Sequence, residues 1–425
     1  MIKTKRIARY LISFIAAGLL FSLFLSGCGL TTTPTPEPVS LNFSYPEIDH
    51  AFYTSLVPVF NQQYPSIRVE LNPVSGDGLY GIDPGESDLM AASVFYLREL
   101  QASSGILGLN AAIQGDDSFN MSDYLQGTVD FLSVEGETWA IPVGIDIDVM
   151  YFNKDLFDQK NVPYPDTGWD WDDFLGYALS IHEPEGDKDR IFGYTTISSH
   201  QDVYSLIYQH GGTLFDDVQN PTEPTFNDPA TVEAVEFFAD LIHSYNVAPT
   251  PAQARSQFGS NRYAFENGIL NGSIAMWSSP LSQRGGYSEG FKWLFNWGVA
   301  VLPRDVFAFT PSWVEDGYAI SAETNHPDEC WALLNFFSGQ INPRLVPPRR
   351  SLVESSTYQD LVGEEISNVV RESLEYAVPV SLWQWVSLGS AIQIFNHAIE
   401  EVVDGSATPQ EALDYAQGRV MDQKP

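Results

Sequence analysis

Cysteine is nearly absent from this sequence. The 425 residues include two, Cys28 and Cys330. Because Cys28 closes an N-terminal leader, no disulfide framework is available to the rest of the chain. Cys330 lies beside Trp331 within a helical pattern, and we expect it to be a buried, unreactive thiol.

Basic residues are also scarce. Lysine and arginine number 21 against 55 acidic residues, a formal net charge of −34. Four of the 21 lie in the first nine residues, so loss of the leader leaves 17 basic residues against 55 acids. Such a surface excludes a nucleic-acid partner, which needs a basic footprint. It also disfavours polyanionic ligands, although a local basic pocket could override the overall field.

Motifs of enzymes and metal sites are lacking. There is no GxSxG, no HExxH and no phosphate-cradling Gly-Lys-Ser/Thr, and the seven histidines are scattered. The acidic turn 183–189 lacks the spacing and the terminal glutamate of a calcium loop. We therefore expect no metal, no cofactor and no catalysis. A glycosidase stays open as an alternative, because it needs only two carboxylates at a fixed separation.

The leader has the pattern of an export signal. An apolar run from Tyr10 to Leu25 follows a basic start and is short for a membrane-spanning helix. The sequence Leu25-Ser-Gly-Cys28 resembles the bacterial lipobox, which implies a signal peptide over 1–27 and a lipid anchor on Cys28 at the cell membrane. A transmembrane anchor is the alternative. Residues 28–40 are rich in Thr and Pro and are expected to form a stiff tether.

The body of the chain begins with a β-α-β pattern. Strands are predicted over 41–45 and 67–71, with an amphipathic helix over 51–64 between them. This order implies a parallel sheet in an α/β fold, and the length suits two lobes. Tyr45 and Glu47 follow the first strand, beyond whose carboxyl end open α/β sheets bind ligands. A further helix is predicted over 121–131.

The most informative stretch runs from Trp139 to Phe174. Residues 145–152 alternate in the period of a strand with two different faces, and one face carries Asp146 and Asp148. Buried carboxylates are costly, so periodicity alone favours an edge strand with both acids in water. Acidic residues at 170, 172 and 173 then open a helix, where the dipole favours negative charge.

Several motifs in order resemble bacterial extracellular solute-binding proteins of family 1, the maltose-binding-protein-like receptors of ABC sugar importers. They are Tyr151-Phe-Asn-Lys-Asp155, Gly211-Gly212, Gly272–Met276, Gly317–Ser321, Pro347–Ser351 and Gly405–Leu413. The resemblance implies a two-lobed α/β fold of the periplasmic-binding-protein type II, with lobe 1 over 41–145 and 304–346 and lobe 2 over 146–303 and 347–425. The sequence departs from the family at 76–85, where a glycine-rich segment replaces an expected amphipathic helix.

The resemblance also implies where a ligand binds. Asp146 matches the family's carboxylate at the first crossing between lobes, which holds a sugar hydroxyl. The other candidates have structural alternatives: core packing, a solvated loop or a brace at a hinge. They are Trp277 and Ser278 after the "AM" strand, Trp313, Glu315 and Asp316 before the next strand, Arg349 at the third crossing, and Trp383 and Trp385 before the last long helix; Tyr45 and Glu47 rest on the strand-end rule alone.

Together these features predict a non-catalytic receptor for a neutral mono- or oligosaccharide. Sugars present apolar patches edged by hydroxyls, which suit aromatic rings and charge-assisted hydrogen bonds. The implied partners are the transmembrane subunits of an ABC permease and the membrane through the lipid anchor, and a monomer is expected. The alternatives are a secreted glycosidase or lyase and a binding protein that serves a sensor.

Overall fold

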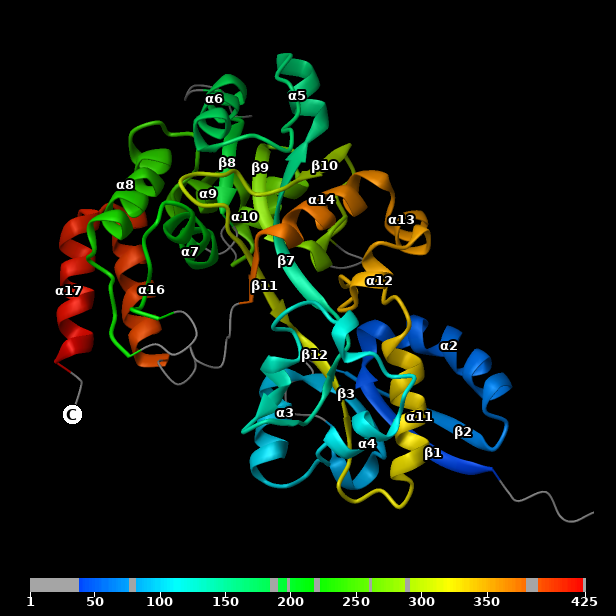
Figure 1. Ribbon diagram of the computed structural model, residues 1–425. Helices are drawn as coiled ribbons and strands as arrows, with labels where there is room; N and C mark the ends of the chain where they lie inside the picture. The colour runs from blue at the N-terminus through cyan, green and yellow to red at the C-terminus, as the bar shows by residue number, and fades with distance from the viewer. Residues whose placement is uncertain are drawn as a thin grey trace, which may run out of the picture.

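The chain forms two lobes, each built around its own β-sheet (Figure 1). The structure is a computed structural model, and it describes residues 38–75, 82–183, 190–196, 199–217, 222–259, 262–286, 291–379 and 389–422. The predicted leader, most of the tether and the segment with Trp383 and Trp385 lie outside these residues.

The first sheet has the strand order β2-β1-β3-β12-β6. Strand β1 pairs in parallel with β2 and β3, whereas β12 is antiparallel to β3 and to β6. The predicted β-α-β opening is therefore confirmed. The strands are β1 (Val39–Pro46), β2 (Ile67–Val74), β3 (Leu89–Ser93), β6 (Ile141–Pro142) and β12 (Asp316–Ile320), and β4 (Ser133–Val134) and β5 (Glu137–Thr138) form a separate hairpin.

Helices cover both faces of this sheet (Figure 1). The aromatic core around Phe43 and Tyr53 packs against Phe337 of α11. Cys330 of the same helix is buried, as predicted, and burial raises the pKa of its thiol to about 12. The helices of this lobe are α2 (His50–Gln63), α3 (Val94–Ala102), α4 (Asn110–Gly115) and α11 (Pro327–Ser338), with 3₁₀ turns η1 (Glu47–Asp49), η2 (Pro84–Glu86), η3 (Met121–Asp123) and η4 (Asp130–Leu132).

The helix predicted over 121–131 does not form. Only the turns η3 and η4 lie there, at the two ends of the segment. Asn120 accepts the backbone N–H of Ser122 and closes a local turn, and Gly127 has a φ of 80°. A residue with such a φ is incompatible with an α-helix, so the apolar spacing over 121–131 was misleading.

The second sheet has the order β13-β11-β7-β9-β8, with β10 also pairing with β7. Strands β9, β10 and β11 are all antiparallel to β7, and β8 is parallel to β9. Strands β8, β9, β10 and β11 therefore run in one direction and β7 runs in the other. The bounds are β7 (Ile145–Asn153), β8 (Phe192–Thr196), β9 (Ile274–Pro280), β10 (Trp297–Ala300), β11 (Thr310–Val314) and β13 (Ala377–Pro379).

Helices cover the second sheet on both faces as well (Figure 1). The even-numbered residues Met150 and Phe152 of β7 face a core that includes α6, α8 and α16, and the odd-numbered residues face a second core that includes α9 and α13. Asp170 and Asp173 form a capping box at the start of α6, which confirms the predicted helix start. The helices are α5 (Lys154–Lys160), α6 (Trp171–Ile181), α7 (Ser199–Gln209), α8 (Pro229–His243), α9 (Pro251–Phe258), α10 (Ala264–Leu270), η5 (Leu281–Gln283), α12 (Arg350–Val353), α13 (Ser356–Val362), α14 (Glu364–Glu375), α16 (Gly389–Asp404) and α17 (Pro409–Met421).

Strand β7 lies inside the second sheet, with β11 on one side and β9 on the other. All nine of its residues are buried, including Asp146 and Asp148. The alternative of an edge strand with both acids in water is therefore wrong. Periodicity could not reveal this, because the partners of β7 come from segments more than 120 residues later in the chain.

The chain passes between the sheets at three places close together. The first is Val143-Gly144, between β6 and β7, and the second is Glu315, between β11 and β12. The third passes Val346, which pairs with Ile145. A Cβ atom on Gly144 would lie 2.6 Å from the Cβ of Leu345, so a glycine lets the first and third crossings approach. The lobe bounds expected from the sequence placed the second crossing between residues 303 and 304. Because β11 belongs to the second sheet, this crossing lies later in the chain.

Candidate functional site

The strands of the second sheet bring polar residues together at one end. Strands β8, β9 and β11 end there, and β7 begins there. Carboxyl ends of parallel strands are where open α/β sheets bind ligands. Thr196 ends β8, Ser278 lies near the end of β9 and Trp313 near the end of β11, while Asp146 and Asp148 lie near the start of β7.

The pairing register places these five residues on one face of the sheet. Trp313 is opposite Asp146, and Asp148 is two residues further along β7. Ser278 is opposite Met150, on the same face as Asp148, and Thr196 is opposite Ser278. Directly paired residues point to the same side of a sheet, as do residues two apart. We call this set the strand-end row: Asp146, Asp148, Thr196, Ser278 and Trp313.

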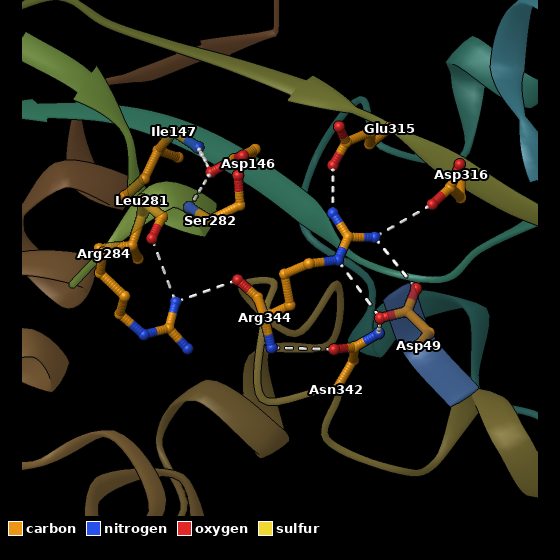
Figure 2. A network of polar contacts seen from close by, with 10 residues as sticks. All are labelled: Asp49, Asp146, Ile147, Leu281, Ser282, Arg284, Glu315, Asp316, Asn342 and Arg344. Atoms are coloured by element: carbon orange, nitrogen blue, oxygen red, sulfur yellow. Dashed lines mark hydrogen bonds and ion pairs between the residues drawn. The ribbon is translucent and has the colours of Figure 1, made fainter. Parts of the chain in front are cut away.

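Asp146 is buried at the base of the row, with 1% of its surface exposed. Its Oδ1 accepts the backbone N–H of Ile147 at 3.0 Å and that of Ser282 at 3.1 Å (Figure 2). Burial raises the pKa of this carboxyl to about 7, and the charge of Glu315 adds to the increase, whereas the hydrogen bonds oppose it. A carboxyl with this pKa exists in both protonation states near neutral pH.

Two buried hydroxyls at the end of β8 have no hydrogen-bond partner among the described residues. They are the Oγ1 atoms of Thr195 and Thr196, whose residues are 0% and 7% exposed. Buried polar groups almost always have a hydrogen-bond partner, so a buried hydroxyl without one is a candidate to bond a ligand. Adjacent strand residues point to opposite faces, so only Thr196 belongs to the strand-end row.

A second polar cluster lies beside the first, around Arg344 (Figure 2). Its guanidinium contacts Asp49 at 3.1 Å, Glu315 at 2.7 Å and Asp316 at 3.3 Å. Asn342 donates to Asp49 at 3.1 Å and accepts the backbone N–H of Arg344 at 2.9 Å. We call these five residues the arginine cluster.

One arginine does not compensate three carboxylates. Burial raises the pKa of Asp316 to about 7, and the charges of Glu315 and Asp49 add to this, although Arg344 opposes it. The same carboxylates raise the pKa of Arg344 above its already high value. Arg344 is therefore always charged, and the cluster carries an excess of acid at the crossings.

The arginine cluster is tied to the second lobe through Arg284. The guanidinium of Arg284 donates to the carbonyl of Leu281 at 3.2 Å and to the carbonyl of Arg344 at 3.0 Å (Figure 2). Leu281 and Ser282 belong to η5, which also holds Asp146. A continuous set of hydrogen bonds thus links Asp146 with the segment before the third crossing.

Residues 46–340 match the family model of the bacterial extracellular solute-binding protein. The chain belongs to this family. An arabinooligosaccharide-binding protein of Halalkalibacterium halodurans is 21% identical over 332 residues, which cover 70% of this chain and 70% of that protein.

Solved structures show the same fold for this solute-binding protein. An ABC substrate-binding protein of Listeria monocytogenes in complex with cycloalternan superposes with a TM-score of 0.71, at 20% identity, over 91% of this chain and 99% of that one. Maltose-bound MalE3 of T. maritima superposes with a TM-score of 0.66, at 17% identity, over 91% and 100%. The fold is the two-lobed type II periplasmic-binding-protein fold, as expected.

The structure brings three of the candidate residues of this solute-binding protein together: Asp146, Ser278 and Trp313. Trp277 is different, because it is paired with Tyr151 on the opposite face of the sheet. Its ring is fully buried and lies 4.8 Å from that of Trp293. The structure therefore supports core packing for Trp277, the alternative that the sequence left open.

Four other candidates have structural partners. Glu315 and Asp316 belong to the arginine cluster. Arg349 lies over the rings of Phe119 and Tyr124 and donates to Ser338 at 3.0 Å, whereas the bracing alternative expected an acidic partner. Tyr45 is fully buried and bonds His50 at 2.8 Å.

Two further groups of candidates stay as predictions. Glu47 is exposed and lies in η1, the turn directly after β1 that also contains Asp49. Trp383 and Trp385 lie outside the described residues. Sequence reasoning missed Arg344, Arg284, Asp49 and Thr196. Their only sequence signal is position, since each ends a strand, follows one or precedes a crossing.

Other features of the described residues do not add a site at the crossings. A groove of about 850 Å³ lies between α2 and the α12–α13 pair, and most of its lining is apolar or small, as with Phe52 and Leu352. Among the described residues, no group of three or more His, Cys, Asp or Glu side chains is placed to hold a metal ion. Within the same ranges, every helix is too short or too polar to cross a bilayer.

Proposed function

We propose that this protein is the extracytoplasmic substrate-binding lipoprotein of an ABC importer, and that it captures a neutral sugar or oligosaccharide between its lobes. The family supports the receptor role. Relatives named as arabinooligosaccharide-, mannitol- and galactooligosaccharide-binding proteins support a sugar or polyol ligand. The overall charge of −34 favours a neutral ligand over an anionic one.

The observation that carries the proposal is the strand-end row. It combines an indole, two carboxylates and two hydroxyls on one face of the sheet, at the end that meets the other lobe. Carboxylates accept strong hydrogen bonds from sugar hydroxyls, and an indole face covers the apolar side of a sugar ring. Relatives named as binding proteins support a role in binding rather than in catalysis.

Binding is proposed to shift the protein toward a closed form. A ligand that contacts both lobes favours closure by its higher affinity for the closed than for the open form. The three crossings, close together and linked by hydrogen bonds, are suited to a hinge. The closed, loaded receptor then delivers its ligand to a membrane permease.

A thermal-shift screen tests the ligand. The chain without its predicted leader is screened against mono- and oligosaccharides, polyols and sugar phosphates. A ligand at 100 times its Kd stabilises the fold by about 2.7 kcal/mol, a shift of a few degrees. The shift is expected to disappear in Asp146→Ala and to persist in Asp172→Asn, a change at an exposed helix start. Recovery of cleaved sugar would promote the enzyme alternative, and no shift with any compound would overturn the sugar proposal.

The lipid anchor has a separate test. Residue Cys28 is proposed to carry acyl chains that hold the protein at the membrane, each buried CH₂ contributing about 0.8 kcal/mol. Cells that express the full chain with radioactive palmitate should label it, and Cys28→Ser should remove the label and release the protein from the membrane fraction. Labelling that survives Cys28→Ser would contradict the anchor.

A further inference from the structure

We propose that Asp148 and Thr196 hold a second sugar unit, beyond the unit that Asp146 holds. In this role the two residues would set the ligand specificity of the protein. The inference rests on the proposed function. It concerns residues of this chain that follow from the register of its second sheet, not from the motif at Asp146.

The first step is the extent of the strand-end row. Asp146 and Thr196 are separated by two strand spacings across the sheet, about 10 Å, and by four residues along it, about 13 Å. Asp148 lies between them, about 7 Å from Asp146 along β7. One sugar ring is too small to reach both ends of this row, so a ligand that contacts both Asp146 and Thr196 has more than one unit.

The second step is the unpaired hydroxyl of Thr196. The residue is 7% exposed, and its Oγ1 has no hydrogen-bond partner in the part of the chain that the structure describes. Thr196 is the last residue of β8, and its side chain lies on the same face of the sheet as those of Ser278 and Asp148. A hydroxyl both donates and accepts, so a sugar hydroxyl satisfies it in either direction.

The third step is the carboxylate of Asp148. It is 7% exposed and shares the face of Asp146. Asp148 already takes part in an interaction within the protein. A carboxylate accepts about four hydrogen bonds, so Asp148 has capacity for a ligand hydroxyl as well. A charged acceptor at this position selects ligands that donate there and rejects those that do not.

Thr195 provides a matched control. It is the neighbouring residue, its hydroxyl is also buried without a partner, and it faces the opposite side of the sheet with Trp277. Thr195→Val and Thr196→Val remove the same group and preserve the side-chain shape. Because both hydroxyls are unpaired in the free protein, neither change is expected to lower stability without ligand.

The test measures affinity by calorimetry along three series: glucose, maltose and maltotriose; mannose and its di- and trisaccharide; arabinose and its di- and trisaccharide. The wild type is expected to gain affinity from the mono- to the disaccharide of at least one series. In Thr196→Val the gain in affinity from mono- to disaccharide should be about tenfold smaller than in the wild type. In Asp148→Asn it should be about 10- to 100-fold smaller. Thr195→Val should bind as the wild type does.

The outcomes separate the two proposals. If the wild type binds a disaccharide and Thr196→Val and Asp148→Asn bind it equally well, the second subsite is overturned and the receptor function stands. If Thr195→Val loses as much affinity as Thr196→Val, the effect comes from the strand and not from a ligand contact, which also overturns it. If the wild type binds no saccharide of any series, the proposed function fails and this inference fails with it. Should Asp148→Asn not fold, Thr196→Val against Thr195→Val decides alone.

Discussion

Two polar clusters meet at the crossings, and they differ in how their groups are satisfied. In the arginine cluster, Arg344 contacts three carboxylates, and Asn342 bonds both Asp49 and Arg344. The strand-end row instead contains a buried hydroxyl, that of Thr196, with no hydrogen-bond partner within the described ranges. Contacts between a protein's own side chains hold its segments in place, whereas unpaired buried groups are suited to an external partner. The arginine cluster therefore joins the protein's own segments at the crossings, whereas the strand-end row is the cluster that we propose binds the ligand.

The difference explains why acidic residues near the crossings cannot be ranked from sequence. Asp146, Glu315 and Asp316 look alike as carboxylates at strand ends. Only the folded chain shows that Arg344 contacts two of them, and Arg344 comes 28 and 29 residues later. Asp146 accepts backbone N–H groups instead and keeps no ion-pair partner among the described residues.

The sharpest way to break the comparison is Arg344→Met. The substitution leaves Asp49 and Asp316 buried with no cation, and breaking a buried ion pair in this way costs about 3–5 kcal/mol. We expect the free energy of unfolding, measured by urea denaturation, to fall by that amount. The control is Lys154→Met, whose pair with Glu365 is more exposed and should contribute at most about 1 kcal/mol. Equal losses in the two variants would show that the arginine cluster does not brace the crossings.

Individual elements of the fold were predictable because their signals are local, whereas the two-lobed type was implied by the resemblance to the family. The β-α-β opening, the acidic helix start at 170–173 and the strand over 145–152 each follow from spacing within a few residues. The edge-strand interpretation of β7 was wrong because its neighbours β9 and β11 come from distant segments. The position of the second crossing was missed for a similar reason, since β10 and β11 both return to the second sheet.

The candidate site was less predictable, since a site depends on faces and partners. The adjacent residues Trp277 and Ser278 have the same sequence context, yet they lie on opposite faces of β9. Thr196 carries no motif, and only the register with Ser278 brings it to the row. Sequence therefore located the strand ends but could not assign individual side chains to the ligand or to the core.

A smaller effect separates Asp146 from exposed acids. Its pKa is raised to about 7, so the folded protein binds a proton that the unfolded chain releases near pH 4. This contribution to stability is present at low pH and is lost as the pH rises through about 7. Asp316 contributes in the same direction.

Asp146→Asn removes the titration of this group. The decline in unfolding free energy between pH 5 and pH 7 should become shallower than in the wild type by up to about 1.4 kcal/mol per pH unit. Urea denaturation at several pH values measures it. Asp172→Asn, at an exposed helix start, should retain the wild-type slope. A slope in Asp146→Asn that matches the wild type would mean that Asp146 titrates in its ordinary range.

The smallest expected effect distinguishes two tryptophans of the second sheet, Trp277 and Trp313. Trp313 is half-buried, on the face of Asp146, and has no aromatic contact among the described residues, whereas Trp277 packs on Tyr151 and Trp293 in the core. Trp313→Ala should weaken binding of the sugar found in the thermal-shift screen by about tenfold, since ring stacking contributes about 0.5–1.5 kcal/mol, with little change in stability. Trp277→Ala should instead lower the unfolding free energy by about 3–5 kcal/mol. Calorimetry measures sugar binding by both variants, and urea denaturation measures their stability. If Trp313→Ala destabilises the protein as much as Trp277→Ala does and binds sugar normally, Trp313 belongs to the core. The strand-end row would then have no aromatic member.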